Sequence, residues 1–236
     1  MELITQAKRL LEKDFIRNYC IMEMMKDAKK VDIDLINESV FIRLKDGQSF
    51  VMLSATNRQE GEALLKRNVR EDDRAFYTVD SWPILFEGKK LHYRSECVQL
   101  YLPESVPVTD DEEGVIPLTE DMAPYIHERY NMKHILSEDY IRERIKTGPG
   151  YGIKDQGVLA GWVMTHEEGT MGLLTVLPEY RRKGYAQKIN EALVRSLRAQ
   201  GKPCLVHIVK GNTASLALSE KSGMVYSCDV EWVMLD

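Results

Sequence analysis

The sequence predicts an α/β fold in two parts, and three observations lead to this prediction. Strand-like and helix-like patterns alternate through the second half. The first half shows one helical pattern followed by short apolar segments with strand character. Between them, "LPESVPVTDDEEGV" combines two prolines with a run of four acids, as a solvated connection would. We expect an N-terminal α+β domain over 1–106 and a C-terminal α/β domain with a mixed sheet over 107–236. A long acidic loop within one domain is the alternative.

The composition favours a soluble globular protein of the cytoplasm. The 236 residues are 44% hydrophobic and 29% charged, with a net charge of -5, which argues against nucleic acid as the main partner. We see no membrane-length apolar run and no signal peptide, so we expect no membrane partner. The four cysteines are far apart, which favours free thiols, and no His/Cys spacing indicates a metal site. The oligomeric state is not indicated.

In the first half, apolar residues recur at three-to-four spacing from Leu3 to Met22 and predict a helix. Strands are expected over 40–44, 49–55 and 74–80, with a hairpin turn at "KDGQ" between the first two. A helix is expected over 58–68, although Gly61 weakens it. The segment 83–102 resembles a further hairpin that turns at Gly88.

In the second half, capping and turn residues mark the ends of the expected helices and strands more clearly. "VIPLT" predicts a short strand, with Thr119 as the cap of a helix, and Ser137 is expected to cap the next helix. Three strands are expected over 150–177, with turns near 155–157 and 167–169. An amphipathic helix, the strand "CLVHIV", a short helix that stops at Gly223 and one or two final strands complete this half.

The segment "LTVLPEYRRKGYAQK" (174–188) carries the clearest functional signal. Arg181, Gly184 and Ala186 form an R-x-x-G-x-A pattern where a strand passes into a helix. The first amides of a helix lack intrahelical partners and lie at the positive end of its dipole, so they can bind a pyrophosphate. Small residues at 184 and 186 would let an anion approach the backbone. A solvated cationic surface is the alternative for "RRKG" alone.

Three segments, in this order, resemble the GCN5-related N-acetyltransferase (GNAT) superfamily. They are "VIPLTEDMAPYI", "LLTVLPEYRRKGYAQKI" and "NTASLALSEKSGM", and the resemblance covers roughly 114–236. The motif "LPEYRRKGYAQ" after a preceding half-chain resembles the glycine N-acyltransferase-like, or FR47-like, branch. In that branch the N-terminal half is a degenerate copy of the same fold. Here such a copy would lack the phosphate loop, and no internal repeat is evident.

The resemblance implies a site for acetyl-CoA or another acyl-CoA, without a metal. Leu174, Thr175 and Val176 would pair with the pantetheine arm through their backbone, as an added strand would. Asn212 would contact pantetheine or substrate, with Ser215 nearby, although Asn212 also fits a plain helix cap. The residues implied for the pyrophosphate are Arg181, Arg182, Lys183, Gly184, Tyr185, Ala186 and Gln187.

Acyl transfer to an amine needs a proton acceptor, and the departing thiolate benefits from a nearby proton. Near the expected strand turn, Glu168 is the main candidate base, with His166 and Glu167 beside it. In glycine N-acyltransferases a Glu after the hairpin glycine acts as the base, and Thr170 stands there in this chain. A solvated turn is the alternative for "HEEG".

His207, in an apolar strand, is a second candidate base or proton relay, and a core histidine is the alternative. Many superfamily members carry a Tyr in the last helix as the proton donor for the thiol. Ser219 stands at that position, which leaves the role vacant or filled through water. Tyr185 and Tyr226 are substitutes, and packing roles are the alternative for both.

The sequence thus predicts an N-acyltransferase that transfers an acyl group from CoA to a small-molecule amine such as an amino acid. One alternative is a catalytically silent acyl-CoA sensor or interaction protein, because Ser219 replaces Tyr and the base is not certain. Another is a protein or peptide N-acetyltransferase.

Overall fold

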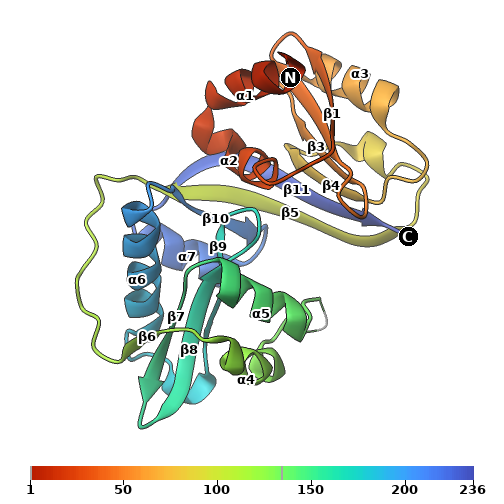
Figure 1. Ribbon diagram of the computed structural model, residues 1–236. Coiled ribbons are helices and arrows are strands. Elements are labelled where there is room, and N and C mark those ends of the chain that lie inside the picture. Colours follow the sequence, from red (N-terminus) through yellow and green to blue (C-terminus); the bar gives the residue numbers. More distant parts are fainter. Residues whose placement is uncertain (1, 134) are drawn as a thin grey trace. The chain divides into compact units, whose positions relative to one another are not determined.

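The computed structural model describes residues 2–133 and 135–236 and confirms the α/β class. The chain forms two compact units (Figure 1): the first comprises the residues up to Tyr101 together with His207–Asp236, and the second comprises Leu102–Val206. This division differs from the expected one at 106/107, because the last strand pairs within the first unit. For the same reason the first unit is the larger one.

The first unit combines helices and strands along most of its length. Its helices are α1 (Glu2–Glu12), α2 (Phe15–Met24), α3 (Arg58–Asn68), the 3-10 turn η1 (Pro83–Leu85) and α7 (Thr213–Lys221). Its strands are β1 (Val31–Ile36), β2 (Ser39–Leu44), β3 (Phe50–Ser54), β4 (Ala75–Val79), β5 (Leu91–Leu102), β10 (Cys204–Val209) and β11 (Val225–Leu235), of which β5 and β10 cross the unit boundaries.

These strands form a mixed seven-stranded sheet in the order β1-β2-β3-β4-β11-β5-β10. Strands β3 and β4 are parallel and are joined through α3, whereas β11 runs antiparallel to both β4 and β5. Phe41, Leu53 and Leu64 belong to a buried apolar core of this unit. The sequence predicted a mixed sheet within 107–236, whereas this mixed sheet takes β1 to β5 from the first half of the chain and only β10 and β11 from the second.

Two expectations for the first half are wrong in detail. The expected single N-terminal helix is broken, because Asp14 caps a new helix by accepting a hydrogen bond from the amide of Arg17 at 3.3 Å. The expected hairpin around Gly88 is also absent from the described residues. Its first arm forms η1, in which Pro83 occupies the first position, and its second arm is the long strand β5.

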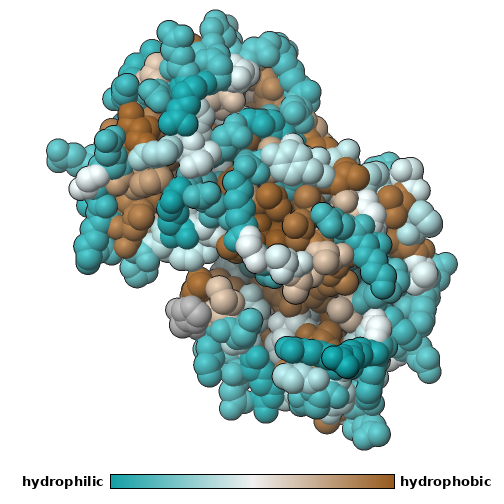
Figure 2. Space-filling view, turned by 180° about the vertical axis from the view of Figure 1, so that it is seen from behind, coloured by the Kyte–Doolittle hydropathy of each residue, from teal (hydrophilic) through white to brown (hydrophobic). Residues whose placement is uncertain are grey.

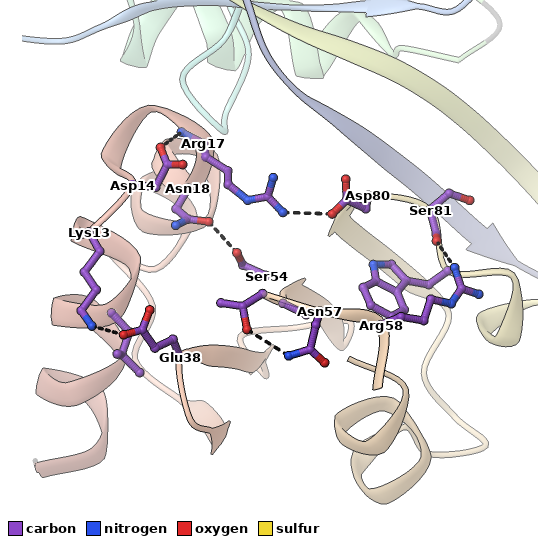
Figure 3. Close-up of a pocket in the computed structure, with 14 residues that line it drawn as sticks. Lys13, Asp14, Arg17, Asn18, Glu38, Ser54, Asn57, Arg58, Asp80 and Ser81 are labelled. Atoms are coloured by element: carbon purple, nitrogen blue, oxygen red, sulfur yellow. Dashed lines mark hydrogen bonds and ion pairs between the residues drawn. The ribbon is translucent and has the colours of Figure 1, made fainter. Parts of the chain in front are cut away.

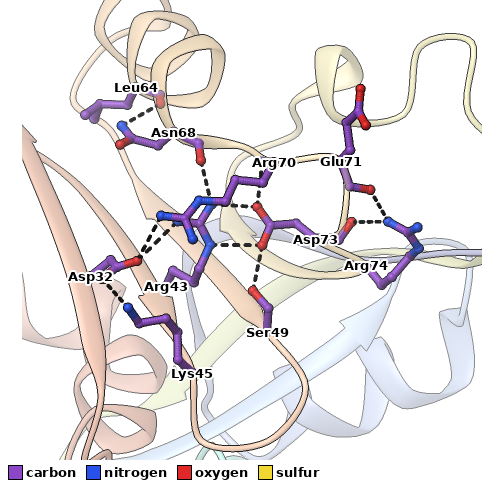
Figure 4. Close-up of polar contacts among 10 residues, drawn as sticks. All are labelled: Asp32, Arg43, Lys45, Ser49, Leu64, Asn68, Arg70, Glu71, Asp73 and Arg74. Atoms are coloured by element: carbon purple, nitrogen blue, oxygen red, sulfur yellow. Dashed lines mark hydrogen bonds and ion pairs between the residues drawn. The ribbon is translucent and has the colours of Figure 1, made fainter.

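A buried ion pair ties the β2–β3 hairpin of the first unit to the segment before β4 (Figure 4). Nε and Nη2 of Arg43 donate to the two carboxylate oxygens of Asp73 at 2.9 and 2.6 Å. Ser49 donates to the same carboxylate at 2.6 Å, and the amide of Arg70 at 2.8 Å. Burial alone would raise the pKa of Asp73, but these donors outweigh it and lower the pKa.

The second unit contains a four-stranded antiparallel sheet in the order β6-β7-β8-β9. The strands are β6 (Val115–Pro117), β7 (Gly150–Asp155), β8 (Val158–Thr165) and β9 (Met171–Val176), and the turns near 155–157 and 167–169 are confirmed. The helices are η2 (Glu120–Met122), α4 (Ala123–Arg129), α5 (Glu138–Thr147), η3 (Pro178–Tyr180) and α6 (Tyr185–Ala199).

Of the two expected caps in this unit, one is confirmed. The hydroxyl of Ser137 accepts a hydrogen bond from the amide of Tyr140 at 3.1 Å. Thr119 precedes η2 but makes no side-chain cap. Helix α6 buries its apolar stripe, including Ile189, Leu193 and Leu197, and packs on the sheet strands β7 and β8.

The acidic segment 109–113 is not a free linker. It lies along α6, where Lys188 Nζ is 2.8 Å from Asp111 Oδ2 and Arg195 Nη2 is 2.9 Å from Glu112 Oε1. Farther along the helix, Arg198 donates to the carbonyl of Val106 at 2.8 Å. These contacts order the segment within the second unit, because the basic face of α6 supplies its counter-charges.

Figure 2 shows hydrophilic residues over much of the visible face, with apolar patches among them. Tyr226 and Leu3 are among the exposed large hydrophobic residues. In the described part of the chain, no helix has the length and apolar character to cross a membrane.

Candidate functional site

The turn between β9 and α6 has a backbone suited to an anion. Arg182 has φ 65° and Gly184 has φ 79°, so two residues close together adopt the left-handed conformation. Left-handed residues in a turn can direct backbone amides to one side, as in anion-binding concavities. We call the segment 181–187 the anion loop.

The N-terminus of α6 begins in this loop and is left open by its own sequence. Gly184 occupies the N-cap position and offers no side chain to the first amides of the helix. The amides of Tyr185, Ala186 and Gln187 therefore lack the usual side-chain partner. A Cβ atom built on Gly184 would meet nothing within 4 Å, so the space beside the loop is open. These features fit a pyrophosphate group.

The cations of the anion loop are partly held by the protein itself. Asp155, at the end of β7, accepts hydrogen bonds from Nζ of Lys183 at 2.6 Å and from the hydroxyl of Tyr185 at 2.9 Å. The bond from Lys183 is the main reason why the pKa of Asp155 is lowered, and that of Lys183 is raised in turn. Arg181 donates to the carbonyl of Val176 at 3.1 Å. Asp155 thus fixes both sides of Gly184.

Strand β9, which leads into this loop, contains a β-bulge. Trp162 is opposite Thr175 and Met164 is opposite Gly172, so two residues of β9 face the single Val163 of β8. Leu173, in the bulge, has φ 53° although it is buried. Bulges occur often beside active sites, where they redirect backbone groups. The sequence does not predict this bulge, because nothing in "MGLLTV" distinguishes Leu173 from an ordinary strand leucine.

Leu174, Thr175 and Val176 form the last part of β9, directly after the bulge. Because β9 is the last strand of the four-stranded sheet, it has one partner in that sheet, namely β8. An edge strand can add an extended ligand through its backbone. The predicted pairing with pantetheine is compatible with this arrangement and stays a prediction.

The turn between β8 and β9 carries the candidate base. Glu168 is only 6% exposed, and its Oε1 accepts a hydrogen bond from the hydroxyl of Thr170 at 2.5 Å. Thr170 stands where the resemblance implied a glutamate, so its hydroxyl positions the carboxylate that lies two residues earlier. Nδ1 of His166 lies 2.8 Å from the hydroxyl of Tyr140 on α5. The turn is therefore an ordered polar cluster.

Glu167 has electrostatic properties that suit a base. Partial burial, followed by the charge of Glu168, raises the pKa of Glu167 above its ordinary value of 4.5. Solvent still reaches Glu167, so water or a small amine has access to it. The pKa of Tyr140 is also raised, chiefly by burial and then by the charges of Glu168 and Glu167, so it stays protonated at neutral pH.

The remaining residues implied for CoA or catalysis lie in the first unit. Asn212 caps α7, since its side chain accepts a hydrogen bond from the amide of Ser215 at 3.2 Å. This contact bears out the helix-cap interpretation of Asn212. Ser219 lies on α7, where its carbonyl accepts from the amide of Met224 at 3.1 Å. The predicted roles of these three residues toward CoA and the thiol stay predictions.

His207, also in the first unit, has the contacts of a core histidine. Its Nε2 lies 3.0 Å from Oε1 of Gln99, and its ring stacks on Tyr77 with the centroids 5.8 Å apart. Its predicted catalytic role stays a prediction. Tyr226 is 60% exposed and donates to Asp229 at 3.2 Å.

Comparisons with known proteins agree with this geometry. A family model described as FR47-like protein matches residues 150–233, which include the anion loop and the β8–β9 turn. No curated protein matches the chain. The solved structures that resemble it share the fold at low sequence identity.

One of these structures is a Drosophila protein, with a TM-score of 0.74 at 15% identity, covering 98% of this chain and 96% of that one. A GNAT-family protein from Novosphingobium aromaticivorans gives 0.56 at 19% identity, covering 83% and 87%. A GCN5-related N-acetyltransferase from Kribbella flavida gives 0.58 at 12% identity, covering 93% and 94%. The chain is thus a GNAT-fold protein. More particularly, residues 150–233 are similar to the FR47-like family.

Proposed function

We propose that this protein is an acyl-CoA-dependent N-acyltransferase that uses acetyl-CoA and a small-molecule amine such as an amino acid. The observation that carries the proposal is the uncapped N-terminus of α6 behind Gly184, beside two left-handed residues and three cations. This combination suits a diphosphate, which every CoA thioester carries. Such a thioester supplies an activated acyl group to an attacking amine.

The chain's own residues would bind the diphosphate, orient the pantetheine arm and remove a proton from the amine. The amides of 185–187, together with Arg182 and Lys183, would hold the diphosphate. The free edge of β9 would align the pantetheine arm along Leu174–Val176. Holding two reactants in one geometry supplies much of the acceleration in such a transfer. The main role of the chain is then to position the thioester and the amine for reaction.

Glu168 would accept the proton of the amine, directly or through a water. Its carboxylate is held by Thr170, and the pKa of Glu167 beside it is raised, which favours proton uptake at this turn. Among the described residues, no cluster of His, Cys, Asp and Glu has the arrangement of a metal site. As the amine nitrogen forms a bond to the acyl carbon, the C–S bond of the thioester breaks, and the CoA thiolate leaves and takes its proton from water.

A coupled assay of thiol release, with acetyl-CoA and a panel of amines, tests the proposal. We expect release above background with at least one small amine. Absence of turnover with every amine, in a protein shown to bind CoA, would contradict the enzymatic role. It would favour the silent acyl-CoA sensor, for which Ser219 in place of a tyrosine is the motivating observation.

A further inference from the structure

A cavity of about 620 Å³ lies in the first unit, apart from the anion loop (Figure 3). Small-molecule sites usually have between about 300 and 1,000 Å³. The cavity is lined by Ser54, the last residue of β3, and by Asp80, which directly follows β4. Strands β3 and β4 are the parallel pair of this sheet, and ligands of open α/β sheets bind beyond the carboxyl ends of such strands.

The lining includes two buried polar side chains that hold each other. The hydroxyl of Ser54 donates to Oδ1 of Asn18 at 2.7 Å, and Nδ2 of Asn18 donates to the carbonyl of Leu11 at 3.0 Å. Ser54 is 7% exposed and Asn18 is 5% exposed. This part of the wall is therefore polar and rigid.

The cavity is lined by charges of both signs in equal number. Nη2 of Arg17 lies 2.9 Å from Oδ2 of Asp80, and these side chains point toward each other in Figure 3. Lys13 and Glu38 form a second ion pair in the lining. The other charged residues of the lining are Asp14 and Arg58. A zwitterion could replace both halves of the Arg17–Asp80 pair, with its carboxylate on Arg17 and its ammonium group on Asp80, whereas a ligand of a single charge could replace only one half.

Asp80 has a backbone conformation that is uncommon outside glycine. Its φ is 65°, and the hydroxyl of Thr78 donates to its carbonyl at 2.8 Å. Residues held in such conformations cluster at ligand sites. Beside it, the guanidinium of Arg58 lies 5.3 Å from the ring centroid of Trp82 and donates to the carbonyl of Ser81 at 3.3 Å. The charged groups of the cavity are thus held in place.

The adjacent helix terminus does not offer a second diphosphate site. Asn57 caps α3 by accepting from the amide of Glu60 at 3.0 Å, in contrast to Gly184 at α6. The side chain of Glu60 adds a negative charge in the first turn and accepts from Thr56 at 3.0 Å. A polyphosphate is therefore disfavoured, and recognition falls to the side chains of both signs.

We infer that this cavity binds a small zwitterion, an amino acid or a short peptide with free termini. Its carboxylate would pair with Arg17, and its ammonium group with Asp80. The site is independent of the anion loop, so the inference stands apart from the proposed acyltransferase activity.

Calorimetric titration of the full chain without CoA tests the inference. The probes are glycine, glycylglycine and triglycine, together with the N-acetylated and C-amidated forms of glycylglycine. We expect at least one free zwitterion to bind with one equivalent, and each blocked form at least tenfold more weakly. No binding by any free zwitterion, or equal binding by both blocked forms, would overturn the inference.

Matched variants locate the binding. Arg17→Gln and Asp80→Asn should each weaken it at least tenfold, and asparagine tolerates the left-handed backbone at position 80. Lys66→Gln, which removes only an exposed cation of α3 outside the cavity, should leave it unchanged. Gly184→Glu should also leave it unchanged, because that residue lies in the second unit. Circular dichroism verifies the folding of each variant. Wild-type affinity in folded Arg17→Gln and Asp80→Asn would sink the inference.

Discussion

The carboxylate of Asp155 lies 2.6 Å from Nζ of Lys183, so the tip of the β7–β8 hairpin holds the loop that opens α6. The same carboxylate accepts from Tyr185, on the other side of Gly184. An acid beside a predicted phosphate site would repel phosphate if it acted alone. Paired with Lys183, it instead ties the loop to the end of β7.

Asp155→Asn should therefore weaken the binding of CoA. The charge-assisted bond to Lys183 is lost and the loop becomes less ordered before the ligand arrives. We expect the dissociation constant to rise about two- to fivefold, the range for an exposed ion pair. Calorimetry at low salt measures it. Asp155→Glu, which keeps the charge, should restore part of the affinity, and an unchanged constant in Asp155→Asn would refute this role.

Glu168→Gln should lower kcat at least about tenfold, which corresponds to 1.36 kcal/mol. The substitution keeps an acceptor for Thr170 but removes the basic carboxylate. The thiol-release assay measures kcat, and His207→Gln provides the comparison in the first unit. Should neither substitution reach a tenfold loss, the assignment of both candidate bases is wrong.

Glu167→Gln should raise the thermal stability at pH 7 but not at about pH 4. Desolvation and then the charge of Glu168 raise the pKa of Glu167, so ionised Glu167 is disfavoured in the folded state, by a small amount because solvent screens its exposed side chain. Its stabilising contribution is complete below its unfolded pKa of about 4.3 and is lost as the pH rises through the folded value. Thermal unfolding at both pH values checks this, and a loss of stability at pH 7 would contradict it.

Asp73→Asn should lower the free energy of unfolding by up to about 3–5 kcal/mol, because it leaves the buried guanidinium of Arg43 only the more distant and more exposed carboxylate of Asp32 as a counter-charge. The pKa of Asp73 is lowered, so its contribution is present above 3.8 and is lost as the pH falls through the folded value. The variant should thus lose less stability on acidification than the wild type.

Urea unfolding at pH 7 and about pH 3 measures both effects of the Asp73 substitution. Lys45→Gln is the control, because the Lys45–Asp32 pair is more exposed and should contribute less than about 1 kcal/mol. Equal losses in the two variants would show that burial does not set the size of the effect.

The sequence predicted best those elements that local patterns determine. The apolar stripe of α6, the cap at Ser137 and the glycine-containing turns all depend on nearby residues. Strand β1 was not predicted, although the alternation of apolar and acidic residues in "VDIDLI" is typical of a partly exposed strand. The prediction of a hairpin at Gly88 was wrong, because a turn residue does not show whether the two segments beside it pair as strands.

Features that depend on long-range pairing could not be predicted. Strand β11 joins β4 and β5, which lie more than a hundred residues earlier, and no local signal specifies this return. The left-handed leucine at 173 depends on the register of β8 against β9. Asp155 and Lys183 are separated by 28 residues and meet only because the hairpin tip reaches the anion loop.

The measurement that tests the central claim most directly is the CoA affinity of Gly184 variants. Gly184→Ala forces a side chain into a left-handed position at a cost of about 1–2 kcal/mol, and Gly184→Glu adds bulk and negative charge at the amides. Gly201→Ala, at the other end of α6 with φ 66° and equally open space, is the matched control. The account predicts CoA binding by the wild type and Gly201→Ala, and at least tenfold weaker binding by Gly184→Glu. Unchanged CoA affinity in Gly184→Glu would contradict the claim that the amides of α6 hold the diphosphate.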